Sequence, residues 1–318
     1  MATHDATDSS LLAPIRGEPD LNPFAGVDFN ELEKSLRRPR TLVNVLLSGL
    51  VTCMTLLALI PLFSVIWMLL WRGGQKLSLA LFTQLPPAPL EQGGGFGNAI
   101  VGTLMIVLLA ALISVPLGIL SAVFMAQAPE GNRLASAVRF SAKVLTGFPS
   151  ILAGVFAYGA VVLAMGGYSA IAGAVAVSIL MLPTIMLTAE DAIRMVPAKM
   201  KEAAIGMGAT RTQTVLMVLL PTAFPGILTG IMLAVARAAG ETAPLLFTAL
   251  FSNYWPVSGH HLDLAKPTAS LAVLIYNFAG MPFQNQVELA WAAALVMVLM
   301  VLITNLIGQS FSRRQVQS

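Results

Sequence analysis

Two ionisable residues stand inside an otherwise apolar stretch of the sequence, residues 222–250. Arg237 and Glu241 are four positions apart, so on one helix they share a face and can form an ion pair. Each charge costs about 2.5–3.5 kcal/mol at the centre of a membrane helix, and pairing offsets only part of this cost. One carboxylate cannot occupy all five N–H donors of a guanidinium, whose planar fork matches tetrahedral oxyanions. Arg237 is therefore the best candidate for contacting an anion, and the alternative is a pair that only fixes helix packing.

Residues 190–221 form a polar segment whose pattern favours docking rather than catalysis. Pro197 suits the first turn of a helix, and Gly208 suits its C-terminal cap. A helix that exposes two alanines beside one carboxylate lets another protein approach closely and offers it one anchoring charge. We expect a short helix, a turn and a second helix here. The residues predicted to make the docking contact are Glu202, Ala203, Ala204 and Gly208.

The sequence carries no arrangement typical of an enzyme or of a metal site. A phosphate-binding loop needs Gly-x-x-x-x-Gly-Lys-Ser/Thr, and the dipeptide Gly-Lys does not occur. The single cysteine, Cys53, excludes a disulfide framework and a thiolate metal site. The adjacent His260 and His261 have no third ligand nearby, and we interpret them as surface-loop residues. We expect no cofactor and no metal, and any ATP hydrolysis must take place on a partner.

The composition places the chain in a membrane. Of its 318 residues, 57% are hydrophobic and only 10% are charged, whereas about a quarter of the residues in a soluble domain are charged. The mean hydropathy is +0.81. A net charge of +3 without an aromatic-laced basic patch does not favour nucleic-acid binding.

The distribution of apolar residues predicts six membrane spans, because a spanning helix needs about 20 mostly apolar residues. The predicted spans are residues 41–70, 98–126, 144–166, 169–189, 222–250 and 289–310. Prolines inside the first four predict kinked helices, at Pro61, Pro116, Pro149 and Pro183. Residues 267–280 are too short to span and predict an interfacial or re-entrant helix. The first forty residues are polar and do not resemble a signal peptide.

Basic residues predict the orientation of these spans. Of the 18 Lys and Arg, Arg237 lies within a span, and three lie on the side opposite the N-terminus: Arg72, Lys76 and Lys266. The remaining fourteen lie on the N-terminal side, so both termini are expected in the cytoplasm. We divide the chain into a cytoplasmic extension, residues 1–40, and a transmembrane domain, residues 41–318. Residues 28–40 predict an amphipathic helix that Pro39 ends.

The docking segment resembles the cytoplasmic signature of ATP-binding-cassette (ABC) importer permeases. That signature is Glu-Ala-Ala, three residues, Gly, nine residues, an aliphatic residue, any residue, and Leu-Pro. Every spacing is present, at Glu202, Ala203, Ala204, Gly208, Val218, Leu220 and Pro221. The resemblance implies an all-α integral membrane protein with six transmembrane helices and the type I ABC importer permease fold. It also implies that residues 202–208 form a coupling helix that docks on an ATPase subunit.

Residues 236–245, Ala-Arg-Ala-Ala-Gly-Glu-Thr-Ala-Pro-Leu, resemble the permease subunits of phosphate-specific ABC importers more closely. Further matches are residues 146–154 and 267–272, and the resemblance covers residues 98–310. The resemblance implies ATP-driven phosphate import across the bacterial inner membrane, with Arg237 and Glu241 lining the translocation path. The implied partners are a PstC-like permease subunit, a PstB-like ATPase dimer and a PstS-like phosphate-binding protein.

Two alternatives to this function stay open. An importer of another oxyanion, sulfate or molybdate, would share the same class, although the Glu-Thr-Ala-Pro segment argues against it. An ion-coupled secondary transporter would need no ATPase and predicts internal repeats, discontinuous helices and more charges at the midplane. The sequence shows only one charged pair within the predicted spans.

Overall fold

The computed structural model describes residues 39–258 and 261–316, which form parts of two units, Met1–Phe63 and Ser64–Ser318. In the first unit, helix α1 (Pro39–Met68) begins at Pro39 and continues into the second. Its side chains are nearly all exposed, as expected of a helix that meets lipid or another subunit. Pro39 therefore opens a helix, and the rest of the amphipathic segment predicted at 28–40 lies outside the described residues.

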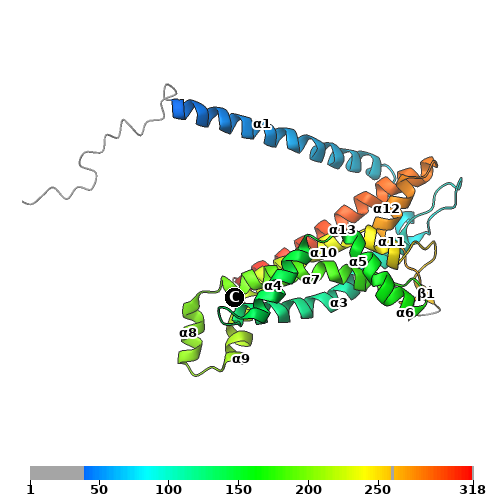
Figure 1. Ribbon diagram of the computed structural model, residues 1–318. Helices are drawn as coiled ribbons and strands as arrows, with labels where there is room; N and C mark the ends of the chain where they lie inside the picture. Colours follow the sequence, from blue (N-terminus) through cyan, green and yellow to red (C-terminus); the bar gives the residue numbers. More distant parts are fainter. Residues whose placement is uncertain (1–38, 259–260, 317–318) are drawn as a thin grey trace, which may run out of the picture. The chain divides into compact units, whose positions relative to one another are not determined.

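The second unit is built almost entirely of helices (Figure 1). Its first half contains the π-helical turn η3 (Leu69–Gly73), α2 (Ala80–Thr83), α3 (Gly97–Gln127), α4 (Arg133–Thr146), α5 (Ser150–Ala157), η4 (Tyr158–Val162), α6 (Leu163–Met165) and α7 (Ala170–Arg194). Its second half contains α8 (Ala198–Gly206), α9 (Arg211–Thr214), η5 (Val215–Leu219), α10 (Leu220–Ala239), α11 (Ala243–Thr248), α12 (Leu271–Ala279) and α13 (Gln284–Val316). The described residues also contain one small antiparallel sheet of two strands, β1 (Val257–Ser258) and β2 (His261–Leu262).

Five helical segments in the described part of the chain are long and apolar enough to cross a membrane. They are Arg40–Gly73, Gly97–Gln127, Ala170–Arg194, Arg211–Ala239 and Gln284–Ser310. A sixth span results if Arg133–Thr146 and Ser150–Met165, which are bent by 107°, are counted as one. The six predicted spans therefore correspond to five continuous segments and one bent pair.

The structure contradicts the predicted start of the third span. Residues 144–166 do not form one helix, because α4 ends at Thr146 and α5 begins at Ser150. Pro149 is the N-cap of α5 rather than a kink inside a helix. A proline disfavours the helical conformation in the residue before it, which explains a break at this point. Three of the basic residues assigned to the N-terminal side, Arg133, Arg139 and Lys143, belong to α4, which packs against α7.

The predicted fifth span, residues 222–250, is also wrong as a single helix. Helix α10 ends at Ala239 with Gly240 as its C-cap, and α11 begins at Ala243. Pro244 explains the break, since a proline in a continuous helix would clash with the carbonyl four residues earlier, that of Gly240. The chain therefore has a discontinuous segment that includes Glu241.

Close helix packing forms the core of the second unit. Helix α7 packs against α3 and α10 along most of its length. Close approach is required at Gly102 in α3, where an added Cβ would lie 2.0 Å from the backbone oxygen of Ala269. Small residues of this kind allow membrane helices to pack tightly.

Helix α12 lies in this core, which contradicts an interfacial helix at residues 267–280, whereas the re-entrant alternative stays a prediction. Leu271, Val273 and Leu274 are fully buried, and the backbone N–H of Leu271 donates to Thr103 Oγ1 at 2.8 Å. A side chain of α3 thus accepts a hydrogen bond from a buried backbone N–H in the first turn of α12. This bond helps to explain how a short helix can be buried inside the unit.

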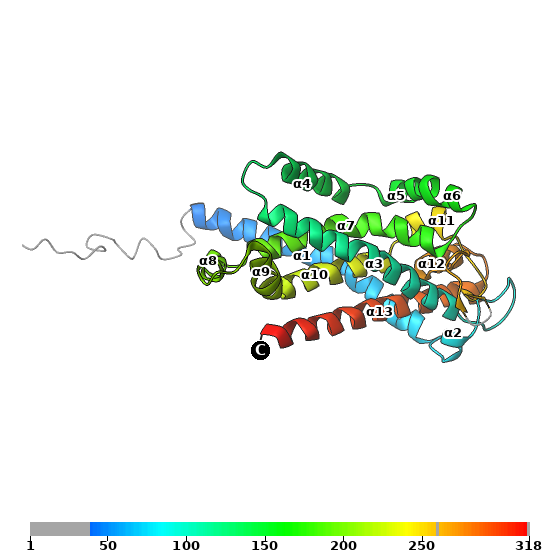
Figure 2. The same ribbon diagram turned by 90° about the horizontal axis from the view of Figure 1, so that it is seen from below.

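Different elements lie at the two ends of the second unit. Helices α8 and α9 and the last described turns of α13 lie at one end, and α6, α11, α12 and β1 lie at the other (Figures 1 and 2). Helices α3, α7 and α13 run toward the α8 end, whereas α10 runs away from it. The two candidate sites from the sequence consequently lie at opposite ends of one unit.

Candidate functional site

Arg237 and Glu241 form the predicted ion pair, with 3.2 Å between Arg237 Nε and Glu241 Oε1. Arg237 lies in the last turn of α10, and Glu241 lies just beyond the helix end. The two do not share one continuous helix face, because the chain turns at Gly240, whose N–H donates to the Arg237 carbonyl oxygen at 3.1 Å. The pair therefore forms across a helix end instead of along a helix.

The pair leaves capacity for another ligand. The Arg237 side chain is 39% exposed, whereas that of Glu241 is 14% exposed. Within the described residues, Nε is the only nitrogen of the guanidinium with a protein partner. Its two terminal nitrogens are therefore available to an anion, and each can donate two hydrogen bonds.

The position of Arg237 along the helix differs from the centre of a span. The segment Arg211–Ala239 has 29 residues, which corresponds to about 43 Å of helix. The hydrocarbon core of a bilayer is about 30 Å thick. Arg237 thus lies at the end of the segment far from α8 and α9, where a break in the helix exposes it.

The predicted docking segment forms the helix, turn and helix that its sequence indicates. Pro197 is the N-cap of α8, one position earlier than predicted. At the other end, Gly208 has a φ of +87°, and its N–H donates to the Ile205 carbonyl oxygen at 2.9 Å. The N–H of Ala209 donates to the Ala204 carbonyl oxygen at 3.0 Å. These two bonds define a Schellman motif. We call residues 195–214 the coupling hairpin.

The structure corrects one residue of the predicted docking surface. Glu202 and Ala203 are exposed, but Ala204 is only 3% exposed, because α8 packs on α9 and η5. Ala204 therefore supports the hairpin from inside. Exposed apolar residues extend the surface around Glu202 and Ala203 instead: Met200, Ile205 and Met207.

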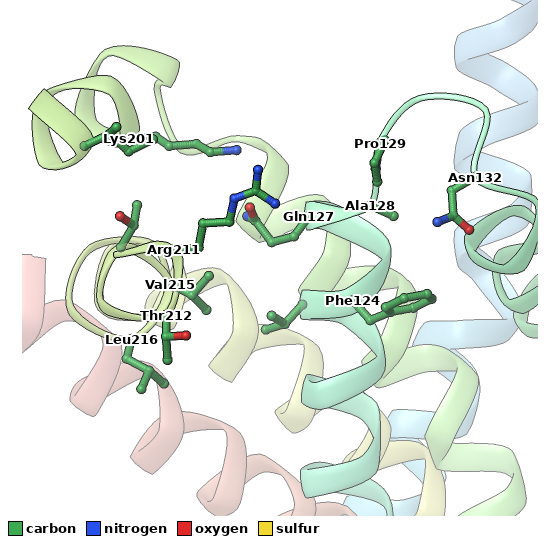
Figure 3. Close-up of a pocket in the computed structure, with 13 residues that line it drawn as sticks. Phe124, Gln127, Ala128, Pro129, Asn132, Lys201, Arg211, Thr212, Val215 and Leu216 are labelled. Atoms are coloured by element: carbon green, nitrogen blue, oxygen red, sulfur yellow. The ribbon is translucent and has the colours of Figure 1, made fainter. Parts of the chain in front are cut away.

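A pocket of about 700 Å³ separates the coupling hairpin from the end of α3. Lys201 and Arg211 of the hairpin extend toward Gln127 at the end of α3, while Phe124 and Leu216 contribute apolar walls (Figure 3). The hairpin consequently does not pack closely on α3 at this point.

Replacing Gly208 with alanine should destabilise the coupling hairpin without creating a clash. No atom lies within 4 Å of an added Cβ, so the cost comes only from the left-handed backbone and amounts to about 1–2 kcal/mol. Hydrogen exchange of the backbone amides of residues 205–209 in the purified protein should accelerate roughly 5- to 30-fold. Gly206→Ala is the matched control, since that glycine is helical and an added Cβ there also meets no atom within 4 Å. Equal acceleration in both variants would contradict this account.

Sequence reasoning missed a buried charge network at the end of α7. The Glu190 side chain is 4% exposed and forms ion pairs with Arg139 of α4 and Arg194 of α7. The spacing of Glu190 and Arg194 by four residues was a visible signal for one of these pairs. Arg139, which lies 51 positions before Glu190, had no such signal.

Comparison with known families defines the class of the protein. Residues 114–317 match the family described as "Binding-protein-dependent transport system inner membrane component". Among solved structures, a chain of the bacterial alginate ABC transporter in complex with alginate pentasaccharide-bound periplasmic protein has a TM-score of 0.60 and 17% identity. The match covers 88% of this chain and 98% of that one. A chain of the MetNI methionine ABC transporter has a TM-score of 0.54 and 21% identity, covering 69% and 93% of the two chains. The fold is that of a type I ABC importer permease, a multi-pass membrane protein and a transport component.

Curated relatives define the family within this class. "Phosphate transport system permease protein PstA" of Yersinia pestis is 40% identical over 254 residues, 79% of this chain and 84% of the relative. The protein of the same name from Haemophilus influenzae is 37% identical over 84% and 93% of the two chains. A "Probable phosphate transport system permease protein PstA" of Methanocaldococcus jannaschii is 37% identical over 80% and 88%. The chain belongs to the PstA family of permease proteins.

Proposed function

We propose that this chain is the permease subunit of an ATP-driven phosphate importer and forms half of its translocation path. The observation that carries the proposal is the likeness, at 37–40% identity over most of both chains, to proteins named as phosphate transport permeases. The family likeness also favours an ATP-driven importer over the ion-coupled alternative, although the chain does contain a discontinuous segment.

The exposed fork of Arg237 supports an anionic substrate. Phosphate presents several oxygens in a tetrahedral arrangement, which a guanidinium can contact with two parallel hydrogen bonds. Glu241 holds the guanidinium through Nε and leaves the opposite edge accessible. In this proposal Arg237 contacts phosphate as it passes, and Glu241 orients Arg237.

We further infer the partners and the orientation. A PstC-like permease subunit supplies the other half of the path, a PstB-like ATPase dimer hydrolyses ATP, and a PstS-like protein delivers phosphate. Glu202, Ala203 and Gly208 belong to the hairpin that docks on the ATPase, with Ala204 as internal support. Residues 1–40 and the hairpin lie on the cytoplasmic side, and the Arg237 end of α10 lies toward the outside.

Reconstitution tests this function. The chain, co-expressed with its sister permease and ATPase, is placed in lipid vesicles together with the binding protein. We expect accumulation of radiolabelled phosphate that requires ATP on the ATPase side and is not reduced by excess sulfate or molybdate. Accumulation of sulfate or molybdate in preference to phosphate would instead establish the other oxyanion importer, and uptake driven by an ion gradient without ATP would exclude both.

A further inference from the structure

Arg139, Glu190 and Arg194 form a three-residue network, which we call the clasp. Arg139 donates to both oxygens of Glu190, with Nε at 3.0 Å from Oε1 and 3.1 Å from Oε2. Arg194 Nε donates to the same Oε1 at 2.8 Å. Such charge-assisted bonds are stronger than neutral ones, and the buried Glu190 would be costly without them. The clasp thus joins α4 to α7 at a fixed point.

The clasp also holds the end of α3. The Met125 carbonyl oxygen would accept the N–H of residue 129 if the helix continued, but that residue is Pro129, which has no N–H. Arg139 Nη2 and Arg194 Nη2 donate to this oxygen instead, at 3.3 Å and 3.1 Å. Three helices therefore meet at two acceptors, the Glu190 carboxylate and the Met125 carbonyl.

The clasp lies directly before the coupling hairpin in the chain. Helix α7 ends at Arg194, and α8 begins at Ala198. Helix α8 itself packs on α9 and η5, and the 700 Å³ pocket separates it from the end of α3. Between the clasp and α8, Val196 packs on apolar residues of α3, α7 and α10. Among the described residues on the N-terminal side of α8, the clasp is the first point where side chains hydrogen-bond the chain to other helices.

From the clasp, α4 and the following α5 extend toward the break between α10 and α11, where Glu241 lies. Helix α4 bends by 107° into the segment that begins with α5, and α5 packs against α11. The contact is tight, since a Cβ on Gly154 would lie 2.6 Å from Pro244 Cα. Because α11 directly follows Glu241, α4 and α5 connect the two ends of the unit (Figure 2).

We propose that Arg139, Glu190 and Arg194 are positioning residues that make α3, α4 and the end of α7 move as one body with the coupling hairpin. This inference rests on the proposed function, in which an ATPase displaces the hairpin. When the hairpin moves, the clasp carries the displacement into α4, and α4 and α5 carry it to α11 and the Arg237–Glu241 pair. Without the clasp, the hairpin still docks and ATP is still hydrolysed. Its displacement then reaches the break only through α10, which continues α9 and η5, while α4, α5 and α11 no longer follow.

The test measures phosphate transported per ATP hydrolysed in the reconstituted complex. Glu190→Gln keeps the shape of the side chain and removes its charge. We expect the complex to assemble and hydrolyse ATP, with a transport ratio roughly 5- to 150-fold lower, the range typical of coupling between two sites. Arg139→Lys keeps the charge without the fork and should lower the ratio less. Glu130→Gln is the matched control, since Glu130 is an exposed carboxylate in the loop between α3 and α4, and it should keep the wild-type ratio.

A reversible crosslink separates coupling from folding. In a Cys53→Ser background, which removes the only native cysteine, Arg139→Cys and Glu190→Cys are combined and joined by a short bis-methanethiosulfonate reagent. The ratio should be low before crosslinking, rise toward wild type after it, and fall again on reduction.

The possible results assign failure to one proposal or the other. A wild-type complex that does not transport phosphate contradicts the proposed function. A transporting wild type whose Glu190→Gln variant keeps the same ratio overturns the clasp alone. Failure of Glu190→Gln and Arg139→Lys to assemble, or a crosslink that restores nothing, also overturns it, because the network would then serve folding and not coupling.

Discussion

Arg237→Ala is expected to lower ATP-driven phosphate uptake roughly 30- to 150-fold, which corresponds to the loss of about 2–3 kcal/mol from charged hydrogen bonds to the substrate. Assembly should be intact, because the side chain is 39% exposed and Glu241 is its only hydrogen-bond partner among the described residues. Initial rates of phosphate uptake into vesicles, normalised to the amount of assembled complex, measure the effect.

Two further variants decide whether the effect belongs to the translocation path. Arg237→Lys keeps the charge without the planar fork, so uptake should fall between that of the wild type and of the alanine variant. Arg133→Ala removes an exposed arginine at the other end of the unit, in the first turn of α4, and should leave uptake unchanged. Normal uptake in Arg237→Ala would exclude a role in the path and favour the packing alternative.

The long helices were predictable because an uninterrupted apolar stretch in a membrane must hydrogen-bond its own backbone, and a helix does this. The second span, predicted at 98–126, is observed as Gly97–Gln127. The fourth, predicted at 169–189, extends to Arg194. Its extra turn carries Glu190, Asp191 and Arg194, which the prediction assigned to the polar segment 190–221. Arg139 pairs with Glu190 there, so a tertiary contact allows the helix to continue.

The breaks in the other spans were not predictable from hydropathy alone. Apart from Arg237 and Glu241, residues 144–166 and 222–250 are as apolar as the continuous helices. Pro149 and Pro244 mark the two interruptions, yet Pro116 and Pro183 lie inside continuous helices. Whether a proline kinks or ends a membrane helix depends on whether neighbouring groups satisfy the freed carbonyl, and the sequence does not reveal those neighbours.

The candidate sites also contain some features that the local sequence predicts and others that depend on tertiary contacts. The coupling hairpin follows from local signals, the left-handed Gly208 and the capping box of Thr210 with Gln213. The burial of Ala204 depends on how α8 lies on η5, a non-local contact. The clasp depends on residues 51 positions apart. Local chemistry could therefore be predicted, whereas orientation and long-range pairing needed the structure.

Glu202→Lys is expected to release the ATPase from the membrane complex. Glu202 is exposed on α8 and has no ion-pair partner in the described part of the chain, so its charge is available to a partner. Reversing the charge removes one attraction and adds a like-charge contact, which costs several kcal/mol at an interface. At about 3 kcal/mol the ATPase would bind roughly 100-fold more weakly. Co-purification with the tagged permease and the dissociation constant in detergent measure the effect.

Glu130→Lys is the matched control for this charge reversal. Glu130 is also exposed and lies in the loop between α3 and α4, at the same end of the unit as the hairpin. If the surface around Glu202 and Ala203 docks on the ATPase, Glu130→Lys should co-purify with it normally while Glu202→Lys does not. Equal loss in both variants would indicate a general response to net charge, and equal retention would remove Glu202 from the docking surface. Membrane insertion should be unchanged in each case, because both residues lie outside the spanning segments.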